Sequence, residues 1–378
     1  MATLDPILTI ETVAAALKVP VTVVSEARGP AFTRYGLRPG PKVRVRRVQL
    51  LAPDLALALG VESVRIDPDP DAIGLEVPRA DRDPVPYAAV VADAEWPASP
   101  VAFALGRDVG GRAYAADLAR MPHLLIAGAT GSGKSVALNV LLTSMLERSG
   151  PDKLRLALID AKRVELAPYA NLAHLVAPVA TEIAAAEELL AHMVGIVEGR
   201  YRRMAATGAR SVGPDALRYV IVVDELTDLL MQSKPSRKHI IRLAQIARAA
   251  GCYLVLATQR PSADIIDGLL KANVPGRIAF ATSSAVDSRV ILDVSGAEAL
   301  LGRGDMLYRP PWLLAPVRLQ GAWITDNEIA AVCARWERPA AAVAPAMPAA
   351  TVPWRHYALG LGIGALVVAY TILAWIMG

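Results

Sequence analysis

The sequence predicts an α/β protein: a large domain built around a parallel β-sheet, a small α+β domain before it and a single transmembrane helix after it. Three observations predict this order. Between residues 116 and 338, continuous apolar runs alternate with segments of helical periodicity, which is typical of a parallel sheet covered by helices. Short strand-like runs separated by Gly and Pro come before this region. Residues 357–377 form an uncharged apolar segment.

The composition indicates a protein of two or three domains. The chain has 378 residues, and its 40 Lys and Arg residues exceed its 36 Asp and Glu residues, with a pI of about 9.1. This small excess is compatible with an anionic partner and does not require one. The two cysteines, Cys252 and Cys333, lack metal-ligand spacing, so we expect Cys252 in the core of a protein from a reducing cytoplasm. No secretory signal is expected in residues 1–9.

Residues 1–115 are predicted to form the small α+β domain, which carries no nucleotide-binding motif. Apolar spacing predicts helices over two segments, residues 9–17 and 52–59. Strands are expected over four short apolar runs: residues 21–24, 43–48, 63–66 and 73–77. In the second run Val alternates with basic residues, which would place Arg44 and Arg46 on one face of a strand. That face is either a solvated edge or a contact for nucleic acid or another partner.

Residues 116–338 are predicted to form the large domain. Its strands are expected where apolar residues predominate over short runs: residues 123–127, 154–159, 219–223, 253–257 and 278–281. Helices are clearest over three longer segments: residues 134–148, 182–206 and 237–250. Gly251 follows the last of these helices, at a position where glycine commonly adopts the left-handed conformation that ends a helix.

The segment between the first strand and the first helix of this domain fits the phosphate-binding pattern G-x-x-x-x-G-K-[ST]. Its residues are Gly128, Ala129, Thr130, Gly131, Ser132, Gly133, Lys134 and Ser135. The glycines allow successive N–H groups to turn toward phosphate oxygens, and the following helix presents its positive end to the same anion. We expect Lys134 to reach the β- and γ-phosphates and Ser135 to ligate Mg²⁺. The pattern therefore predicts binding of ATP with Mg²⁺.

Polar residues follow two further strands, at the sheet edge where this loop is expected. Asp224 and Glu225 follow the run 219–223. Asp224 can hold Mg²⁺ through water, and Glu225 can deprotonate the water that attacks the γ-phosphate. Gln259 follows the run 253–257 and is expected to contact the γ-phosphate. Phosphoryl transfer also needs a cation for the charge of its transition state, and spacing alone leaves three candidates open: Arg242, Arg248 and Arg260.

Residues 339–356 are predicted to form a linker, because their prolines exclude a regular helix. Residues 357–377 contain no charged residue and, at ~1.5 Å per residue, can cross the ~30 Å hydrocarbon core of a bilayer. Trp354 and Trp375 lie near the two ends, where interfacial aromatic residues are common. Basic residues before this segment predict a single-pass protein of the cell inner membrane whose large domain faces the cytoplasm. The alternative is a buried core helix.

Several stretches, in the same order, resemble the motor region of the FtsK/SpoIIIE family of DNA translocases over residues 29–310. They include GPAFTRY at 29–35, LIDAK at 158–162, ARAAG at 247–251, LATQRPS at 256–262 and GRGDMLY at 302–308. The resemblance implies a RecA-like P-loop ATPase domain preceded by the family's α domain. It also implies a ring, usually a homo-hexamer, that threads double-stranded DNA and pulls it by ATP hydrolysis.

The resemblance implies roles for basic residues that spacing leaves open. ATP would lie between subunits, with Arg248 donated to the site by the neighbouring subunit. Three residues would face the pore and grip phosphates without reading bases: Arg260, Lys271 and Arg289. DNA binding should then tolerate any sequence and weaken steeply with salt. The alternative is that each of them is an ordinary surface cation.

The chain departs from the family pattern in ways that affect the expected role. Ala285 stands where the family commonly has Lys, and the segment between Arg202 and Tyr219 is short. Only the linker and the apolar segment follow Arg338, so we expect no winged-helix domain that reads DNA, and a C-terminal anchor. We therefore expect a membrane-tethered, ATP-driven DNA translocase that acts in DNA segregation or transfer, such as conjugation.

Two other functions are compatible with parts of the sequence. A secretion ATPase with the same fold would move a protein substrate, respond to a polypeptide and ignore DNA. A nucleotide switch without motor activity would hydrolyse ATP no faster than background, and the presence of Glu225 and Gln259 argues against it. Stimulation of hydrolysis by duplex DNA would separate the first hypothesis from both.

Overall fold

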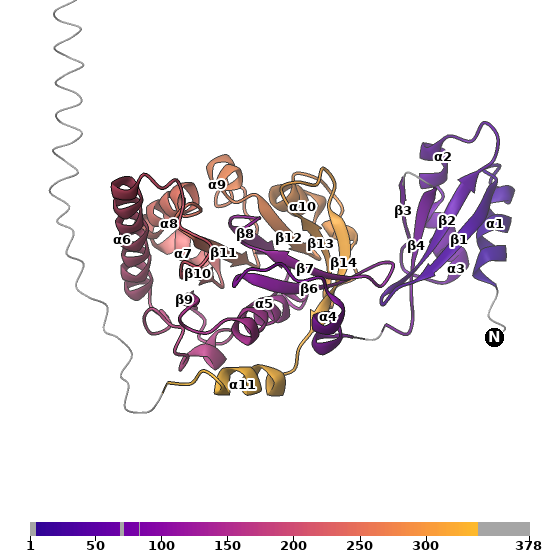
Figure 1. Ribbon diagram of the computed structural model, residues 1–378. Helices are drawn as coiled ribbons and strands as arrows, with labels where there is room; N and C mark the ends of the chain where they lie inside the picture. Colours follow the sequence, from indigo (N-terminus) through magenta and orange to yellow (C-terminus); the bar gives the residue numbers. More distant parts are fainter. Residues whose placement is uncertain (1–4, 69–71, 83, 339–378) are drawn as a thin grey trace, which may run out of the picture.

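The computed structural model describes residues 5–68, 72–82 and 84–338 of the chain. The strands of these residues form two sheets, one of four strands near the N-terminus and one of ten. Figure 1 shows the smaller sheet at one end of an elongated molecule and the larger one, covered by helices, in the rest. The predicted linker (339–356) and transmembrane helix (357–377) lie outside the described residues. Within the described ranges, no helix combines the length and apolar character that a membrane span requires.

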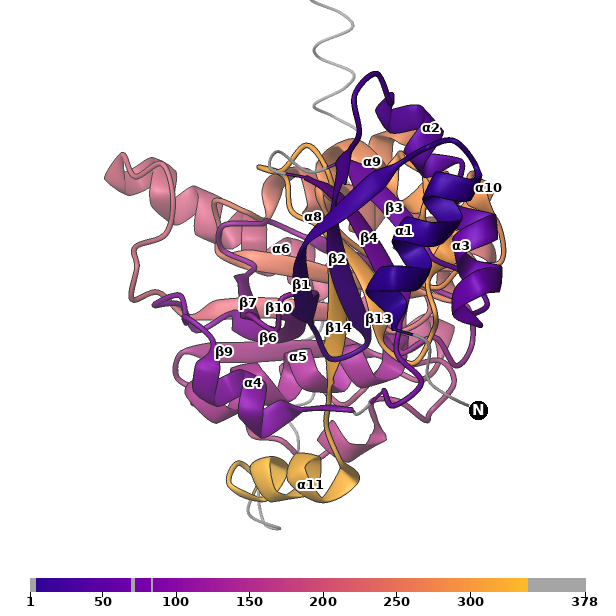
Figure 2. The same ribbon diagram turned by 90° about the vertical axis from the view of Figure 1, so that its right-hand side faces the viewer.

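The N-terminal domain is an antiparallel sheet backed by helices. Its spatial order is β1-β2-β4-β3, from β1 (Val21–Arg28), β2 (Phe32–Pro39), β3 (Arg65–Pro68) and β4 (Ile73–Pro78). Three helices accompany these strands: α1 (Pro6–Ala16), α2 (Val45–Gln49) and α3 (Ala52–Leu59). Figure 2, in which this domain faces the viewer, shows α1 and α3 packed together beside the sheet. The core between helices and sheet includes the fully buried Ile10, Leu37, Leu55 and Leu75.

One predicted strand of this domain is wrong. Residues 43–48 were expected to be extended, but α2 occupies Val45–Gln49. Arg44 is extended just before this helix and Arg46 lies within it, so the two do not share a strand face. Only Val48 of α2 is buried, and it packs in the core of this domain, so the alternation of Val with basic residues does not mark a strand with one buried face.

Five parallel strands form the centre of the large sheet, as the sequence predicts: β8 (Leu124–Ala127), β9 (Leu154–Ile159), β10 (Arg218–Val223), β11 (Cys252–Thr258) and β12 (Gly276–Phe280). The three predicted helices are confirmed as α5 (Lys134–Arg148), α6 (Ile183–Thr207) and α8 (Lys234–Ile246). Shorter helices complete the cover: α4 (Tyr87–Asp93), α7 (Leu226–Gln232), α9 (Gly268–Asn273), α10 (Ala285–Leu292) and α11 (Asp326–Ala334). Cys252 is fully buried, as expected. Gly251 has the expected positive φ, +65°, but it does not end α8, because this helix ends at Ile246 and a turn separates it from Gly251.

Antiparallel strands extend this sheet beyond β12, so the sheet is mixed and only its centre is parallel. The added strands are β13 (Asp305–Arg309), β14 (Val317–Trp323), β6 (Ala102–Asp108) and β7 (Ala113–Asp117), in that spatial order. β5 (Val85–Pro86) pairs with β14. Residues 85–117 thus belong to the large sheet, which corrects the predicted boundary between 115 and 116. β6 and β7 carry Gly, Arg and Asp, so they do not form the unbroken apolar runs by which buried strands are recognised.

Arg318 of β14 joins the N-terminal domain to the large sheet. Its guanidinium donates to both carboxylate oxygens of Asp305, at 3.0 and 2.6 Å, and to the Glu76 carboxylate at 2.6 Å. The guanidinium carbon lies 3.8 Å from the ring centroid of Phe32. The side chains of Arg318, Glu76 and Asp305 are all buried. Because Glu76 and Phe32 belong to the N-terminal sheet, this ion cluster fixes one domain against the other.

Replacing Arg318 with Met is expected to lower the free energy of unfolding by about 3–5 kcal/mol, because two buried carboxylates would lose their partner. Urea unfolding followed by circular dichroism measures this loss. Replacing Arg163 with Met is the matched control, since Arg163 and Glu182 form an exposed ion pair that contributes little. A loss below about 1 kcal/mol in the Arg318 variant would show that the cluster does not hold the domains together.

Candidate active site

The predicted phosphate loop lies between β8 and α5, at the carboxyl edge of the parallel strands. Gly131 and Gly133 adopt φ values of +76° and +120°, which residues with a Cβ rarely adopt. A Cβ on Gly133 would also lie 2.7 Å from the backbone nitrogen of Gly304. Because α5 begins at Lys134, the N-terminus of a 15-residue helix adjoins the loop. The loop amides and the helix end together suit an anion.

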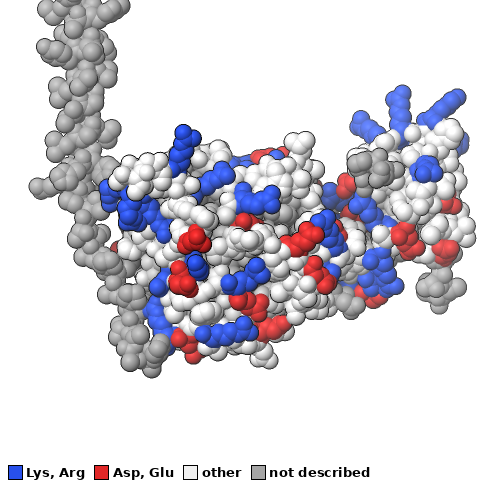
Figure 3. Space-filling view, in the orientation of Figure 1, with Lys and Arg blue, Asp and Glu red and all other residues white. Residues whose placement is uncertain are grey.

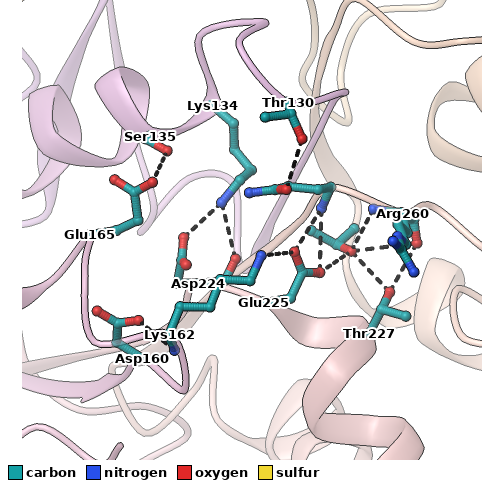
Figure 4. Close-up of polar contacts among 12 residues, drawn as sticks. Thr130, Lys134, Ser135, Asp160, Lys162, Glu165, Asp224, Glu225, Thr227 and Arg260 are labelled. Carbon is teal, nitrogen blue, oxygen red and sulfur yellow. Dashed lines mark hydrogen bonds and ion pairs between the residues drawn. The ribbon is translucent and has the colours of Figure 1, made fainter.

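Lys134 and Asp224 form a buried ion pair beside the loop (Figure 4). The Lys134 Nζ atom donates to Asp224 Oδ1 at 2.7 Å and to the Asp224 backbone oxygen at 3.1 Å. Their side chains are only 3% and 1% exposed. The other carboxylate oxygen, Oδ2, has no hydrogen-bond partner among the described residues. Together with the Ser135 hydroxyl, this buried oxygen fits the hard oxygen ligands that Mg²⁺ prefers.

Glu225 follows Asp224 and is surrounded by hydrogen-bond donors. Its Oε1 atom accepts a 2.5 Å hydrogen bond from the Thr258 hydroxyl, and the Gln259 backbone nitrogen lies 3.3 and 3.2 Å from its two oxygens. Lys162 Nζ donates to Oε2 at 3.3 Å. The Glu225 side chain is only 4% exposed. The structure therefore brings the predicted Glu225 and Gln259 together, and it adds Thr258 and Lys162, which the sequence pattern did not single out.

A cavity of about 500 Å³ opens next to the loop. Gln259 borders it, and the Gln259 Oε1 atom accepts a 3.1 Å hydrogen bond from the Thr130 hydroxyl of the loop. Another part of the lining is apolar: Val85, Leu105, Phe280, Ala322 and Trp323. The loop suits a polyphosphate and the apolar lining suits a flat ring. The sequence pattern did not predict this apolar side, because most of it comes from the antiparallel strands.

The three candidate arginines lie in different places. Arg260 is exposed directly after β11, at the same edge as the loop, and its backbone oxygen accepts a 2.9 Å hydrogen bond from the Thr227 hydroxyl. Arg248 is exposed shortly before β11, at the other end of this seven-residue strand. Such a strand spans ~23 Å at ~3.3 Å per residue. Arg242 pairs with Glu198 at 3.7 Å. Arg248 therefore lies at the sheet edge away from its own cavity.

His123, just before β8, confirms this placement of Arg248. The His123 Nδ1 atom accepts a 2.9 Å hydrogen bond from the Leu254 N–H, so the side chain links β8 to β11. Burial lowers the pKa of His123 to about 4, and the nearby charge of Arg248 acts in the same direction. Arg248 thus lies at the amino ends of the central strands, away from the cavity.

Lys271 and Arg289, which the resemblance assigns to DNA contact, lie side by side on α9 and α10. Lys271 Nζ donates to the Arg289 backbone oxygen at 3.4 Å and pairs with Asp293. Arg277 and Arg309 pair with the same carboxylate. Although burial opposes the shift, hydrogen bonds from Lys271 and Arg277 hold the pKa of Asp293 below its usual value. Lys271 is thus tied into an ion cluster and only 21% exposed, whereas Arg289 is exposed.

Basic side chains gather most clearly on the N-terminal domain. Figure 3 shows them projecting from its top, over α2. This helix and the residue before it contribute Arg44, Arg46 and Arg47, all of them exposed. Over the large domain, basic and acidic side chains are intermixed on the same face. The exposed arginines of α2 thus lie on the N-terminal domain, whereas the cavity lies in the large domain.

Two family models match most of the described chain. Residues 88–217 and 214–263 match the FtsK/SpoIIIE family, and residues 6–79 match the FtsK alpha domain. The chain belongs to the FtsK/SpoIIIE family. The matches to the two models meet between residues 79 and 88, where the two sheets of the structure also separate. The N-terminal domain is therefore the FtsK alpha domain of this family member.

Relatives within the FtsK/SpoIIIE family are much longer than this chain. DNA translocase FtsK of Lactiplantibacillus plantarum is 46% identical over 340 residues, which cover 84% of this chain and 43% of the relative. DNA translocase FtsK of Caldanaerobacter subterraneus subsp. tengcongensis is 47% identical over 324 residues, which cover 82% of this chain and 46% of the relative. The chain thus spans less than half the length of these two relatives.

Solved structures of lower identity share the fold of this FtsK/SpoIIIE chain. The pCW3 conjugation coupling protein TcpA, in a monomer form with ATPgS, is 22% identical, with a TM-score of 0.59 over 85% of this chain and 96% of that chain. The cytoplasmic domain of the Thermomonospora curvata type VII secretion ATPase EccC is 23% identical, with a TM-score of 0.58 over 68% of this chain and 34% of that chain. These similarities show a mixed α/β, RecA-like ATPase fold.

Proposed function

We propose that this chain is an ATPase that converts ATP hydrolysis into movement along double-stranded DNA. The observation that carries the proposal is the convergence of Lys134, Asp224 and Glu225 at one edge of the sheet, where Lys134 and Gln259 line the cavity. This set supplies a phosphate-binding cation, a metal ligand and a general base. Relatives at 42–47% identity bear the name DNA translocase FtsK, which favours DNA over a protein substrate.

Each residue of this set has a role in the proposed reaction. The loop, residues 128–135, holds the phosphates through its N–H groups. When ATP binds, the Lys134 ammonium group would leave the Asp224 carboxylate and pair with the β- and γ-phosphates. Ser135 and Asp224 would hold Mg²⁺, which neutralises phosphate charge when bound. Glu225 takes a proton from the attacking water, and Gln259 contacts the γ-phosphate.

Glu225 must change partners before it can act as a base. The Thr258 hydroxyl, the Gln259 N–H and the Lys162 ammonium group surround its two oxygens. A carboxylate engaged by so many donors has little capacity left to accept a proton from water. We infer that movement at the end of β11 releases Glu225. Contact between the Gln259 side chain and the γ-phosphate would couple that movement to ATP.

A neighbouring subunit completes the ATP site in this proposal. Arg248 lies at the end of β11 away from its own cavity. It would therefore stabilise the transition-state charge in the ATP site of a neighbouring subunit. A closed ring follows when every subunit gives and receives one such arginine, and a homo-hexamer is the ring that the family resemblance implies. Duplex DNA would pass through it, with phosphate contacts from Arg260, Lys271 and Arg289. Residues 357–377 would anchor the ring to the inner membrane for segregation or transfer of DNA.

Replacing Arg248 with Ala is expected to slow ATP hydrolysis by roughly 10³-fold or more while ATP binding is retained. Mixing this variant with a Lys134→Ala chain should restore part of the rate, because mixed rings contain complete sites. Steady-state hydrolysis by each variant alone and by the mixture measures this. The matched control is Arg242→Ala, which removes an arginine paired with Glu198 and should stay near wild type. A mixture no faster than its components would contradict donation between subunits.

The proposed function is tested by ATP hydrolysis of the purified full-length chain with and without duplex DNA of arbitrary sequence. We expect stimulation by every duplex, and we expect it to fall steeply between about 50 and 200 mM salt as phosphate contacts are lost. Polypeptides should have no effect. Intact hydrolysis that duplex DNA leaves unchanged at low salt would contradict the DNA substrate, and stimulation by polypeptide alone would favour a secretion ATPase.

A further inference from the structure

The loop that follows β9, residues 160–166, is fixed by one buried carboxylate. Asp160 is 1% exposed. Its Oδ1 atom accepts from the backbone N–H groups of Lys162 and Arg163 at 3.1 and 2.9 Å, and its Oδ2 atom accepts from the Leu166 N–H at 3.0 Å. The Asp160 N–H donates to the Ala180 backbone oxygen at 2.9 Å. These bonds set the shape of the loop from within the core, so its side chains are presented in defined positions.

This loop presents two side chains to the candidate active site (Figure 4). Lys162 reaches Glu225, as described above. Glu165 reaches Ser135, whose hydroxyl donates to Glu165 Oε1 at 2.6 Å. In the same view the Ser135–Glu165 pair lies beside the Lys134–Asp224 pair. The loop therefore brings a second carboxylate, Glu165, up to the residue whose hydroxyl we propose as a metal ligand.

The hydrogen bond from Ser135 has a chemical consequence for that role. A serine hydroxyl has one proton and two lone pairs, and it binds a cation through a lone pair. The proton must then point to an acceptor on the other side of the oxygen. Glu165 Oε1 is such an acceptor, and it is the one to which the Ser135 hydroxyl donates in this structure. Hydrogen-bonded partners of this kind orient metal ligands, and their loss typically weakens metal binding by about 10- to 100-fold.

We propose that Glu165 is a positioning residue for the Mg²⁺ of the ATP site. It accepts the Ser135 hydroxyl proton and so keeps a Ser135 lone pair directed at the cation, while Asp160 holds the loop that carries it. The inference rests on the proposed function, since Ser135 has a ligand role only when nucleotide and Mg²⁺ are bound. The phosphate contacts proposed for Lys134, the metal-ligand role of Asp224 and the base role of Glu225 do not require Glu165.

The test measures binding of a fluorescent ADP analogue to the full-length chain, first in EDTA and then as Mg²⁺ is added. Glu165→Ala is expected to raise the half-saturating Mg²⁺ concentration about 10- to 100-fold and to leave affinity in EDTA unchanged. Glu165→Gln keeps an oxygen that can accept the Ser135 proton, so it should recover most of the Mg²⁺ response. The matched control is Glu182→Ala, because Glu182 contacts the same loop at Arg163 and does not contact Ser135. It should behave as wild type.

Three results would overturn the inference. The first is a Mg²⁺ dependence that Glu165→Ala leaves unchanged. The second is a loss of affinity in EDTA as large as the loss with Mg²⁺, which would make Glu165 a purely structural residue. The third is a Glu165→Gln variant as defective as Glu165→Ala, which would assign the effect to charge and not to the Ser135 proton. A wild-type chain that binds no ADP at all would instead overturn the proposed function, and the inference with it.

Discussion

Replacing Glu225 with Gln is expected to leave ATP binding intact and to slow hydrolysis by roughly 10²- to 10⁴-fold. An amide cannot take a proton from the attacking water. It keeps an oxygen that can accept from the Thr258 hydroxyl and the Gln259 N–H, so the fold around the site should be retained. Single-turnover hydrolysis and equilibrium ATP binding, measured on the same preparation, separate the two effects.

A carboxylate close by in the sequence provides the control for this change. Asp228 lies in the first turn of α7, and it does not line the cavity beside the loop. Asp228→Asn removes one charge from the same region and should hydrolyse ATP at a rate near wild type. A Glu225→Gln chain that hydrolyses ATP within tenfold of wild type would exclude Glu225 as the general base.

Replacing Lys134 with Ala is expected to weaken ATP binding by at least about 100-fold, or roughly 2.8 kcal/mol at 1.4 kcal/mol per tenfold. Two effects add. The phosphates lose their buried cation, and the Asp224 carboxylate, 1% exposed, is left as an unpaired negative charge beside them. Equilibrium binding of a fluorescent ATP analogue with Mg²⁺ measures the loss.

The unpaired Asp224 can also destabilise the fold, so a second variant is needed. In Lys134→Ala/Asp224→Asn the stray charge is gone, and thermal unfolding should return toward the wild-type temperature. ATP binding should stay weak in this double variant, because the cation is still absent. Retained binding in either variant would show that the loop 128–135 does not hold the phosphates through Lys134.

The sequence predicts the parts of the fold whose signal is local. The central strands β8 to β12 are rich in apolar residues because both of their faces are buried, although β9, β10 and β12 each contain one arginine. The outer strands β6 and β7 and the N-terminal strand β2 contain Gly, Arg or Asp, and their membership of a sheet depends on distant partners. That is why the domain boundary and the antiparallel half of the sheet could not be predicted.

The candidate site divides in the same way. The loop 128–135 and the Asp224–Glu225 pair follow strands in the sequence, so pattern and spacing suffice to predict them. Glu165 and Lys162 have no such signal, because each is defined by a contact with a residue 30 or 63 positions away. The stretch 158–162 was part of the family resemblance, but only the structure shows what its loop contacts. The same holds for Arg248, whose distance from its own cavity depends on the direction of β11.

Displacement of a third strand from a DNA triplex tests most directly whether ATP hydrolysis moves this chain along a duplex. The purified full-length chain is given a linear duplex of arbitrary sequence that carries a triplex-forming oligonucleotide near one end. We expect the oligonucleotide to be released with ATP and Mg²⁺, and to stay bound when ATP is omitted or Glu225 is replaced with Gln. If duplex DNA stimulates ATP hydrolysis but the oligonucleotide is not released, movement along DNA is contradicted.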